Sequence, residues 1–260
     1  HRELVKEMAS LKPSFMSVTY GAGGSREGLM LDIADEMENV NKVTALAHLT
    51  CITADKPKIK DTLDKLKKIN IENILALRGD IPEGVDFPNP LQYRYASELI
   101  CDIKKQSDFC IGGACYPEGH PDSPSFDADI EGVRKKVDAG CDILITQMFF
   151  DNDILYNYMF KLLSKGINVP VIAGIMPVIN ARQAKKTCEL SNTRLPRRFR
   201  MIVDKFGDNP ACMKQAGIAY ATEQIIYLIA NGVKNIHIYA MNKPDVAQSI
   251  MNNLSEIFKR

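Results

Sequence analysis

The stretch Asn73-Ile-Leu-Ala-Leu-Arg-Gly-Asp80 joins a short apolar run to a polar end. The apolar residues predict a buried strand, and Arg78, Gly79 and Asp80 follow at its carboxyl end. Glycine allows backbone conformations and close approaches that other residues do not. Parallel α/β enzymes carry their functional residues at the carboxyl ends of their strands. The stretch therefore predicts an enzyme with a parallel α/β fold.

Similar apolar runs recur along the chain, with helical spacing between them. Strands are expected at residues 14–20, 44–51, 74–77, 109–116, 143–149, 170–175 and 235–241. Helices are expected at residues 27–40, 58–70, 95–106, 129–139, 153–165, 181–190 and 211–230. Gly140, Gly166 and Gly232 lie just before strands, where a left-handed residue commonly ends a helix. Alternating strands and helices predict a parallel sheet with right-handed crossovers.

Two fold classes fit this alternation. A doubly wound nucleotide fold is possible because Tyr20-Gly-Ala-Gly-Gly-Ser25 follows a strand, but its spacing is not Gly-x-Gly-x-x-Gly and the next strand lacks a ribose-binding acid. The length of 260 residues fits a single (β/α)8 TIM barrel, which typically has about 250 residues. We predict this barrel, as one domain over residues 1–260. A helical pattern at residues 2–11 precedes the first counted strand, so we expect the eighth strand upstream of His1.

Charge and hydropathy exclude several classes of partner. Lys and Arg total 33 against 32 Asp and Glu, so the chain has no net field to attract nucleic acid or an anionic membrane. No apolar run approaches the roughly 20 residues that cross a bilayer, and the first residues do not resemble a signal peptide. Seven cysteines without a Cys-x-x-Cys pair predict reduced thiols and no metal site. A cytoplasmic protein without a nucleic-acid or membrane partner is expected.

Polar residues follow the expected strands, and parallel strands would bring these residues to one face. Each residue also has a simpler interpretation. His48 could be a hydrogen-bonded core histidine, and Gln147 could satisfy neighbouring backbone groups. Arg78 and Asp80 could form a structural ion pair. Their expected convergence is the argument for a functional site.

Two further segments indicate a cofactor. The loop Tyr116-Pro-Glu-Gly-His-Pro121 is stiffened by its prolines and carries an aromatic ring, an acid and an imidazole, which suits an aromatic cofactor ring. The basic cluster Arg134-Lys135-Lys136 could be a solvated helix face or a clamp for a diphosphate. Phosphate-loop, serine-esterase and zinc-protease motifs are absent from the sequence, so a redox cofactor fits better.

These residues together resemble the flavin-dependent methylenetetrahydrofolate reductases. The resemblance runs through nearly the whole chain and rests on motifs that occur in the order of that family. The motifs are Ser17-Val-Thr-Tyr-Gly-Ala-Gly-Gly24, Ala47-His-Leu-Thr-Cys51, Leu75-Ala-Leu-Arg-Gly-Asp80, Tyr116-Pro-Glu-Gly-His-Pro121, Lys136-Val-Asp-Ala-Gly140, Ile145-Thr-Gln147 and Gly174-Ile-Met-Pro-Val178.

The resemblance implies an enzyme of one-carbon metabolism and methionine biosynthesis. It would reduce methylenetetrahydrofolate to methyltetrahydrofolate by successive hydride transfers through FAD, with electrons from NADH or NADPH. The implied FAD contacts are Thr19, His48, Leu77, Arg78, Gly79, Asp80, Tyr95, Ala96, Ala114, Tyr116, His120, Asp129, Lys135 and Lys136. The implied folate contacts are Asp80, Gln147, Gln183 and Lys243. Asp80 would be catalytic, because a carboxylate stabilises the iminium cation that forms when the folate ring opens.

The sequence departs from the family at three places. The family's first strand carries a glutamate that acts as general acid, and that strand would precede His1. Lys243 stands where members often have an arginine, and Thr187 stands where they often have an aromatic residue. The electron donor is therefore open: a partner electron-transfer subunit could replace the nicotinamide. A flavin- or folate-binding homologue without catalysis is the other alternative. We also expect a homo-oligomer.

Overall fold

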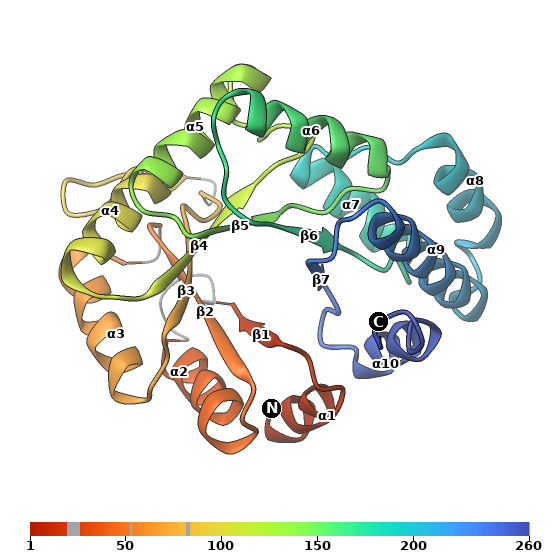
Figure 1. The fold of residues 1–260 in the computed structure, drawn as a ribbon, viewed down its shortest axis with the longest axis horizontal. Helices are drawn as coiled ribbons and strands as arrows, with labels where there is room; N and C mark the ends of the chain where they lie inside the picture. The colour runs from red at the N-terminus through yellow and green to blue at the C-terminus, as the bar shows by residue number, and fades with distance from the viewer. Residues whose placement is uncertain (20–26, 53, 82–83, 260) are drawn as a thin grey trace. The chain divides into compact units, whose positions relative to one another are not determined.

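The computed structural model describes residues 1–19, 27–52, 54–81 and 84–259, but not the side chain of Gln183. Helices and strands alternate along these residues (Figure 1). The strands are β1 Phe15–Val18, β2 Thr44–Thr50, β3 Asn73–Leu77, β4 Cys110–Cys115, β5 Ile143–Thr146, β6 Val171–Ile175 and β7 Ile236–Ile238. The helices are α1 Arg2–Ser10, α2 Glu27–Asp35, the π-helix η1 Glu36–Val40, α3 Lys56–Lys68, α4 Ala96–Gln106, α5 Phe126–Asp138, α6 Asn152–Ser164, α7 Ala181–Ser191, α8 Arg197–Phe206, α9 Pro210–Ala230 and α10 Pro244–Asn253.

The strands follow one another in the sheet in chain order, from β1 to β7. The pairs β1–β2, β2–β3, β3–β4 and β6–β7 are parallel. This confirms the predicted parallel α/β class, and the seven strands among the described residues follow one another as in a (β/α)8 barrel. The described residues form two compact units, the first made of His1–Ala114 and Gly132–Leu144 and the second of Cys115–Glu131 and Ile145–Arg260. The prediction of one domain stays a prediction.

In the first unit, alternate strand residues divide between the two sheet faces. Leu49, Ile74 and Ile111 are fully buried and belong to the face that carries the core under the helices. The opposite face includes His48 and Leu75, which are register partners, and Gly112, which is the partner of Leu75 on the next strand. The register therefore aligns side chains in layers across β2, β3 and β4.

In the second unit, α9 packs against α8 and α10. One apolar cluster joins Phe149, Ile175 and Ile225 to residues of α10, and a second contains Phe199, whose ring stacks on Tyr220 with centroids 4.0 Å apart. At Gly217 a Cβ atom would lie 1.8 Å from the carbonyl oxygen of Val178, so only glycine permits this approach of α9. The packing of α9 fixes the segment that follows β6.

The sequence patterns locate most elements but miss two helices. All seven predicted strands are present, and Gly140, Gly166 and Gly232 have the expected positive φ of 106°, 73° and 87°. Helices α8 and α10 were not predicted. In α8, Phe199 and Val203 are buried among several arginines. Phe199, Ile202, Val203 and Phe206 recur at i, i+3, i+4 and i+7, which is the spacing of an amphipathic helix, so the sequence contained a signal for α8 that the prediction overlooked.

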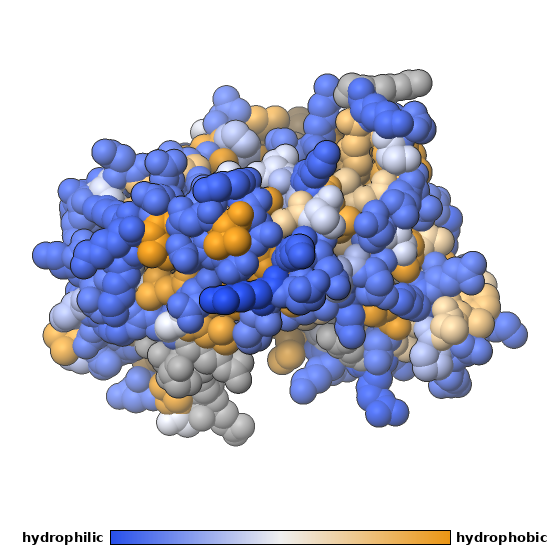
Figure 2. All heavy atoms as spheres, turned by 90° about the horizontal axis from the view of Figure 1, so that it is seen from below, coloured by the Kyte–Doolittle hydropathy of each residue, from blue (hydrophilic) through white to orange (hydrophobic). Residues whose placement is uncertain are grey.

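The surface drawn in Figure 2 is mostly hydrophilic, with hydrophobic residues in small groups. Single exposed apolar side chains of this kind are usual on proteins. Within the described part of the chain, no helix is both long and apolar enough to cross a membrane.

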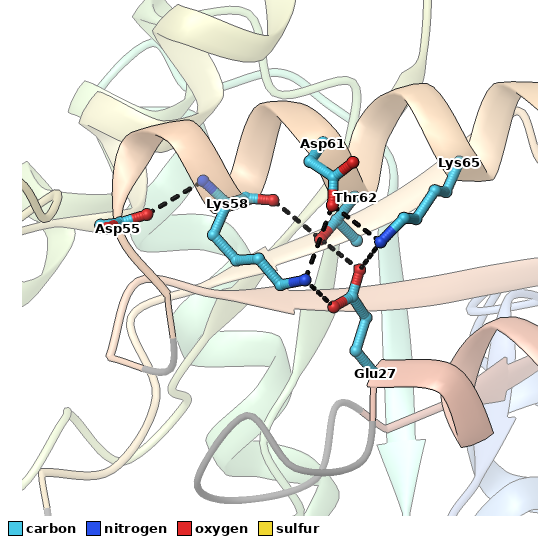
Figure 3. A network of polar contacts seen from close by, with 6 residues as sticks. All are labelled: Glu27, Asp55, Lys58, Asp61, Thr62 and Lys65. Carbon is cyan, nitrogen blue, oxygen red and sulfur yellow. Dashed lines mark hydrogen bonds and ion pairs between the residues drawn. The ribbon is translucent and has the colours of Figure 1, made fainter.

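A buried carboxylate joins α2 to α3 in the first unit (Figure 3). Glu27, the first residue of α2, is paired with Lys58 and lies 3.2 Å from the ammonium of Lys65. The hydroxyl of Thr62 donates to the same carboxylate at 3.0 Å. Burial opposes ionisation, but the hydrogen bonds from Lys58, Lys65 and Thr62 outweigh it and lower the pKa of Glu27. The network fixes the start of α2 on α3.

We expect Glu27→Gln to lower the free energy of unfolding by about 1–2 kcal/mol at neutral pH, because two partly exposed lysines lose a buried partner. A carboxyl whose pKa is lower in the folded state stabilises the protein above its unfolded pKa, and this contribution is lost as the pH falls. Denaturant unfolding between about pH 5 and pH 3 should therefore be less pH-dependent in Glu27→Gln than in the wild type. Asp61→Asn, at an exposed position of the same network, should change little. An equal pH dependence in Glu27→Gln and the wild type would contradict this role.

Candidate functional site

The end of β3 is shaped by a close backbone approach in the first unit. Pairing with the neighbouring segment continues past the strands, since Cys51 N donates to Leu77 O and Ile52 N to Arg78 O, both at 3.0 Å. Gly79 has φ +85°, and a Cβ atom there would lie 2.3 Å from Cγ2 of Ile52. Arg78 is half-buried and Asp80 is exposed. The prediction that Gly79 permits a close approach at the end of this strand is confirmed.

Several predicted FAD contacts share one sheet face of the first unit. His48 is the register partner of Leu75, and Leu77 lies two residues further on the same face, beside Thr50. Ala114 lies two residues beyond Gly112 and so belongs to this face as well. Thr19 is exposed and directly follows β1. The face thus presents an imidazole between apolar side chains near the carboxyl ends of the strands.

The two lysines of α5 differ in their surroundings. Both lie in the last turn of the helix. The ammonium of Lys136 donates to the carbonyl oxygen of Ala114 at 2.7 Å, which holds a cation at the carboxyl end of β4. Lys135 is exposed, and its position also suits a simple interaction with the helix dipole. Of the two lysines, Lys136 is the one whose ammonium lies at the end of a strand.

Tyr95 and Ala96 mark the start of α4. Tyr95 occupies the N-cap position with an exposed ring, and the guanidinium of Arg94 lies 5.3 Å from the ring centroid. Ala96 is 4% exposed, so its methyl group belongs to the core. A ligand would reach Ala96 through the backbone N–H groups that a helix leaves unbonded in its first turn.

In the second unit, the loop after β4 is ordered by turns, as its composition predicts. Gly119 has φ +86° and donates to the carbonyl of Tyr116, while Ser123 N donates to the carbonyl of His120, both at 3.0 Å. The rings of Tyr116 and His120 meet edge to face, with centroids 4.5 Å apart. Asp122 N donates to Nδ1 of His120 at 3.0 Å, so the neutral imidazole carries its proton on Nε2.

Two carboxylates near this loop have different surroundings. The Glu118 carboxylate accepts hydrogen bonds from Arg194 N at 3.1 and 3.2 Å, and burial raises the pKa of Glu118. Glu118 therefore ties the loop to the segment before α8, a role that the sequence does not indicate. Asp129 is half-buried in the first turn of α5, near Tyr158. Burial and the negative charge of Asp129 both contribute to raising the pKa of Tyr158.

Gln147 directly follows β5. Its backbone N donates to Cys115 O at 2.7 Å, and its side-chain oxygen accepts from Met148 N at 2.9 Å. The simpler interpretation, that Gln147 satisfies a neighbouring backbone group, is therefore confirmed for its oxygen. Gln183 lies on α7, with its side chain outside the described part of the structure.

A pocket of about 120 Å³ lies at the carboxyl ends of β6 and β7, within the second unit. Its lining is largely apolar and includes Met176, Tyr239 and Lys243. Lys243 is exposed at the N-cap of α10, after Met241 and Asn242, which have φ of 50° and 58°. Consecutive left-handed residues other than glycine are strained and concentrate at functional sites. Sequence patterns indicated Lys243 but not Tyr239, whose role depends on contacts far along the chain.

The cysteines and acids of the described residues do not suggest another centre. Burial raises the pKa of Cys51 to about 12 and that of Cys141 to about 11, so these thiols stay protonated at neutral pH. Across residues 1–19, 27–52, 54–81 and 84–259, no three His, Cys, Asp or Glu side chains are grouped so that they could hold a metal ion. The absence of a metal site stays a prediction.

Comparison with known proteins identifies the family. Residues 2–255 match the methylenetetrahydrofolate reductase family. The chain belongs to this family. It is 35% identical over 250 residues to 5,10-methylenetetrahydrofolate reductase of Escherichia coli (strain K12), covering 96% of this chain and 83% of that protein. It is also 35% identical over 268 residues to methylenetetrahydrofolate reductase (NADH) 1 of Arabidopsis thaliana, covering 98% of this chain.

The chain spans 45% of the length of the Arabidopsis thaliana member. Among solved structures it is similar to 2,3-dimethylmalate lyase, a PEP mutase/isocitrate lyase superfamily member. The TM-score is 0.52, with 12% identity over 99% of this chain and 78% of that chain. This likeness supports the fold alone.

The first unit of this family member has side chains whose chemistry fits FAD. A dinucleotide needs cations for its diphosphate and hydrogen-bonding groups for its rings. Lys136 and Arg78 are cations at the ends of β4 and β3, and His48 lies on the sheet face between apolar neighbours. Gly79 has a positive φ and no side chain, so the backbone can pass close to the side chain of Ile52.

Proposed function

We propose that the protein reduces methylenetetrahydrofolate to methyltetrahydrofolate with FAD as cofactor and NADH or NADPH as electron donor. The family match over residues 2–255 carries the proposal. The geometry adds a carboxylate, Asp80, exposed at the end of β3 next to a glycine that permits close backbone approach. We include in the proposal a single catalytic domain, a cytoplasmic location and a homo-oligomer.

Residues of the first unit would bind the cofactor and stabilise charge. Bound FAD would supply hydride transfer between the nicotinamide and the folate. Lys136 would pair with the diphosphate, and His48, Leu77 and Ala114 would lie against the rings from their common sheet face. Asp80 would stabilise the positive charge that develops on the substrate as its ring opens. Thr19, Arg78, Gly79, Tyr95, Ala96 and Lys135 complete the proposed FAD contacts in this unit.

Residues of the second unit are proposed for both ligands. Tyr116, His120 and Asp129 are the remaining proposed FAD contacts. Gln147 can donate and accept, which suits the polar edge of a pterin. The pocket near Lys243 combines an apolar lining with one ammonium, which suits an aromatic ring that bears a carboxylate. Gln183 is proposed as a further folate contact from the family resemblance.

A partner electron-transfer subunit is the second candidate for the electron source. It is favoured by Thr187, which lies half-buried on α7 where an aromatic residue often helps to stack the nicotinamide or the folate. In this alternative the flavin and folate sites are unchanged, but the nicotinamide does not react directly with the protein.

The experiment uses the full natural protein, reconstituted with FAD and kept anaerobic. We expect NADH or NADPH to bleach the absorbance of the oxidised flavin at about 450 nm. Methylenetetrahydrofolate should then restore it. A protein that is colourless once unbound FAD has been removed would contradict the proposal. Bleaching by dithionite but by neither nicotinamide, followed by reoxidation by the folate, would instead support the partner subunit.

A further inference from the structure

The segment that carries Gln147 is held by side chains from distant parts of the second unit. Four backbone carbonyls in and beside this segment accept side-chain hydrogen bonds. The bonds are Tyr239 OH to Thr146 O at 2.6 Å, Thr193 Oγ1 to Met148 O at 3.3 Å, Gln224 Nε2 to Phe149 O at 2.9 Å and Tyr220 OH to Phe150 O at 2.7 Å. Irregular backbone that is buried needs such partners. Here they also fix the direction in which Gln147 leaves β5.

Of these four donors, Tyr239 acts on the peptide next to Gln147. Its acceptor, Thr146 O, belongs to the peptide bond that joins Thr146 to Gln147. The space for its ring depends on Gly174, where a Cβ atom would lie 2.6 Å from Cε2 of Tyr239. Gly174 N in turn donates to the hydroxyl of Thr146 at 2.9 Å. Burial raises the pKa of Tyr239, so its hydroxyl keeps the proton that it donates. Thr146 is thus held through its side chain and its carbonyl.

Both polar groups of the Thr146–Gln147 peptide are held, since Thr146 O accepts from Tyr239 and Gln147 N donates to Cys115 O at 2.7 Å. The side-chain oxygen of Gln147 accepts from Met148 N, which belongs to the next peptide, so the side chain is tied to the backbone that continues from the held peptide. A rotation of the Thr146–Gln147 peptide would therefore move the amide of Gln147 as a whole. A displacement of about 1 Å at a binding group can cost a large factor in the reaction with substrate.

We propose that Tyr239 is a positioning residue, which holds the Thr146–Gln147 peptide so that the Gln147 amide meets the folate substrate. The inference rests on the proposed role of Gln147 in the function described above. It assigns to Tyr239 an action through Gln147, although its ring also lines the pocket near Lys243.

The test compares Tyr239→Phe with Tyr220→Phe in the full natural protein. Each variant removes one phenol hydroxyl that donates to a backbone carbonyl of the same connection, but Tyr220 acts at Phe150, further from Gln147. We expect Tyr239→Phe to raise the KM for methylenetetrahydrofolate about fivefold, because the variant loses the one hydrogen bond by which Tyr239 holds Thr146 O. The rate of flavin reduction by the electron donor should not change. Tyr220→Phe should lower thermal stability similarly and leave KM unchanged.

A third variant, Gln147→Ala, separates the inference from the function on which it rests. Gln147→Ala should raise the same KM, and adding Tyr239→Phe to it should have less than about a twofold further effect, because the two residues act as a unit. A normal KM in Tyr239→Phe, or an equal rise in Tyr220→Phe, would overturn the positioning role alone. A fully additive effect of Tyr239→Phe in the Gln147→Ala background would also overturn it. A normal KM in Gln147→Ala would contradict the proposed folate contact as well.

Discussion

Replacing Asp80 by Asn will slow the transfer of reducing equivalents from the flavin to methylenetetrahydrofolate about 100-fold, the scale on which a single electrostatic group stabilises a transition state. Asn keeps the size of the side chain and its ability to accept a hydrogen bond, but it loses the negative charge that, in the proposed function, would face the developing cation. Asp80 is exposed at the end of β3, so its replacement leaves the core intact. Anaerobic stopped-flow absorbance of the flavin measures the rate directly.

The matched control is Asp86→Asn, which removes an exposed carboxylate further along the same connection. It should leave the rate unchanged. FAD affinity, measured by the quenching of flavin fluorescence, should change less than about threefold in Asp80→Asn, because most proposed cofactor contacts remain. A variant that loses FAD as completely as it loses the folate reaction would show that Asp80 serves the cofactor rather than the chemistry.

Gly79→Ala should be the most damaging small substitution at the end of β3. Its Cβ atom would lie 2.3 Å from Cγ2 of Ile52, at a backbone φ of +85°. Both the overlap and the left-handed conformation disfavour alanine, and we expect the free energy of unfolding to fall by about 2–4 kcal/mol. The shift of this backbone should also raise the Kd for FAD by at least about tenfold, because neighbouring Arg78 and Asp80 move with it.

Gly84 offers a control that separates the cost of the left-handed conformation from the cost of the overlap with Ile52. It also has a positive φ, +77°, but a Cβ atom there would have no atom within 4 Å. Gly84→Ala should therefore lose only about 1 kcal/mol, the cost of the backbone conformation alone. Denaturant unfolding of both variants separates conformation from overlap. Equal losses in the two variants would mean that contact with Ile52 is not what requires glycine at position 79.

The sequence predicts the fold well because a parallel sheet repeats one simple pattern. Each buried strand is a short apolar run, and the helix ends at Gly140, Gly166 and Gly232 use the one residue that tolerates a left-handed conformation. Helix α8 was missed although Phe199, Ile202, Val203 and Phe206 recur at helical spacing in its basic segment. The helix predicted at residues 27–40 spans α2 and the π-helix η1 together, but the sequence period does not indicate the change to π-helical hydrogen bonding at Glu36.

The candidate site is predicted in part for a similar reason. Asp80, His48 and Gln147 stand out as polar residues in or just after apolar strands. Their supporting contacts do not stand out, because Tyr239 meets Thr146 across a separation of 93 residues. A long-range hydrogen bond leaves no period and no motif in the sequence, so it is found only once the fold is known.

The most direct test of the central claim mixes the anaerobic protein, its flavin already reduced with dithionite, with methylenetetrahydrofolate. Chemical reduction makes the result independent of whether a nicotinamide or a partner subunit supplies electrons. We expect the absorbance of oxidised flavin to return and one methyltetrahydrofolate to form for each flavin reoxidised. A flavin that stays reduced in the presence of saturating methylenetetrahydrofolate would contradict this claim.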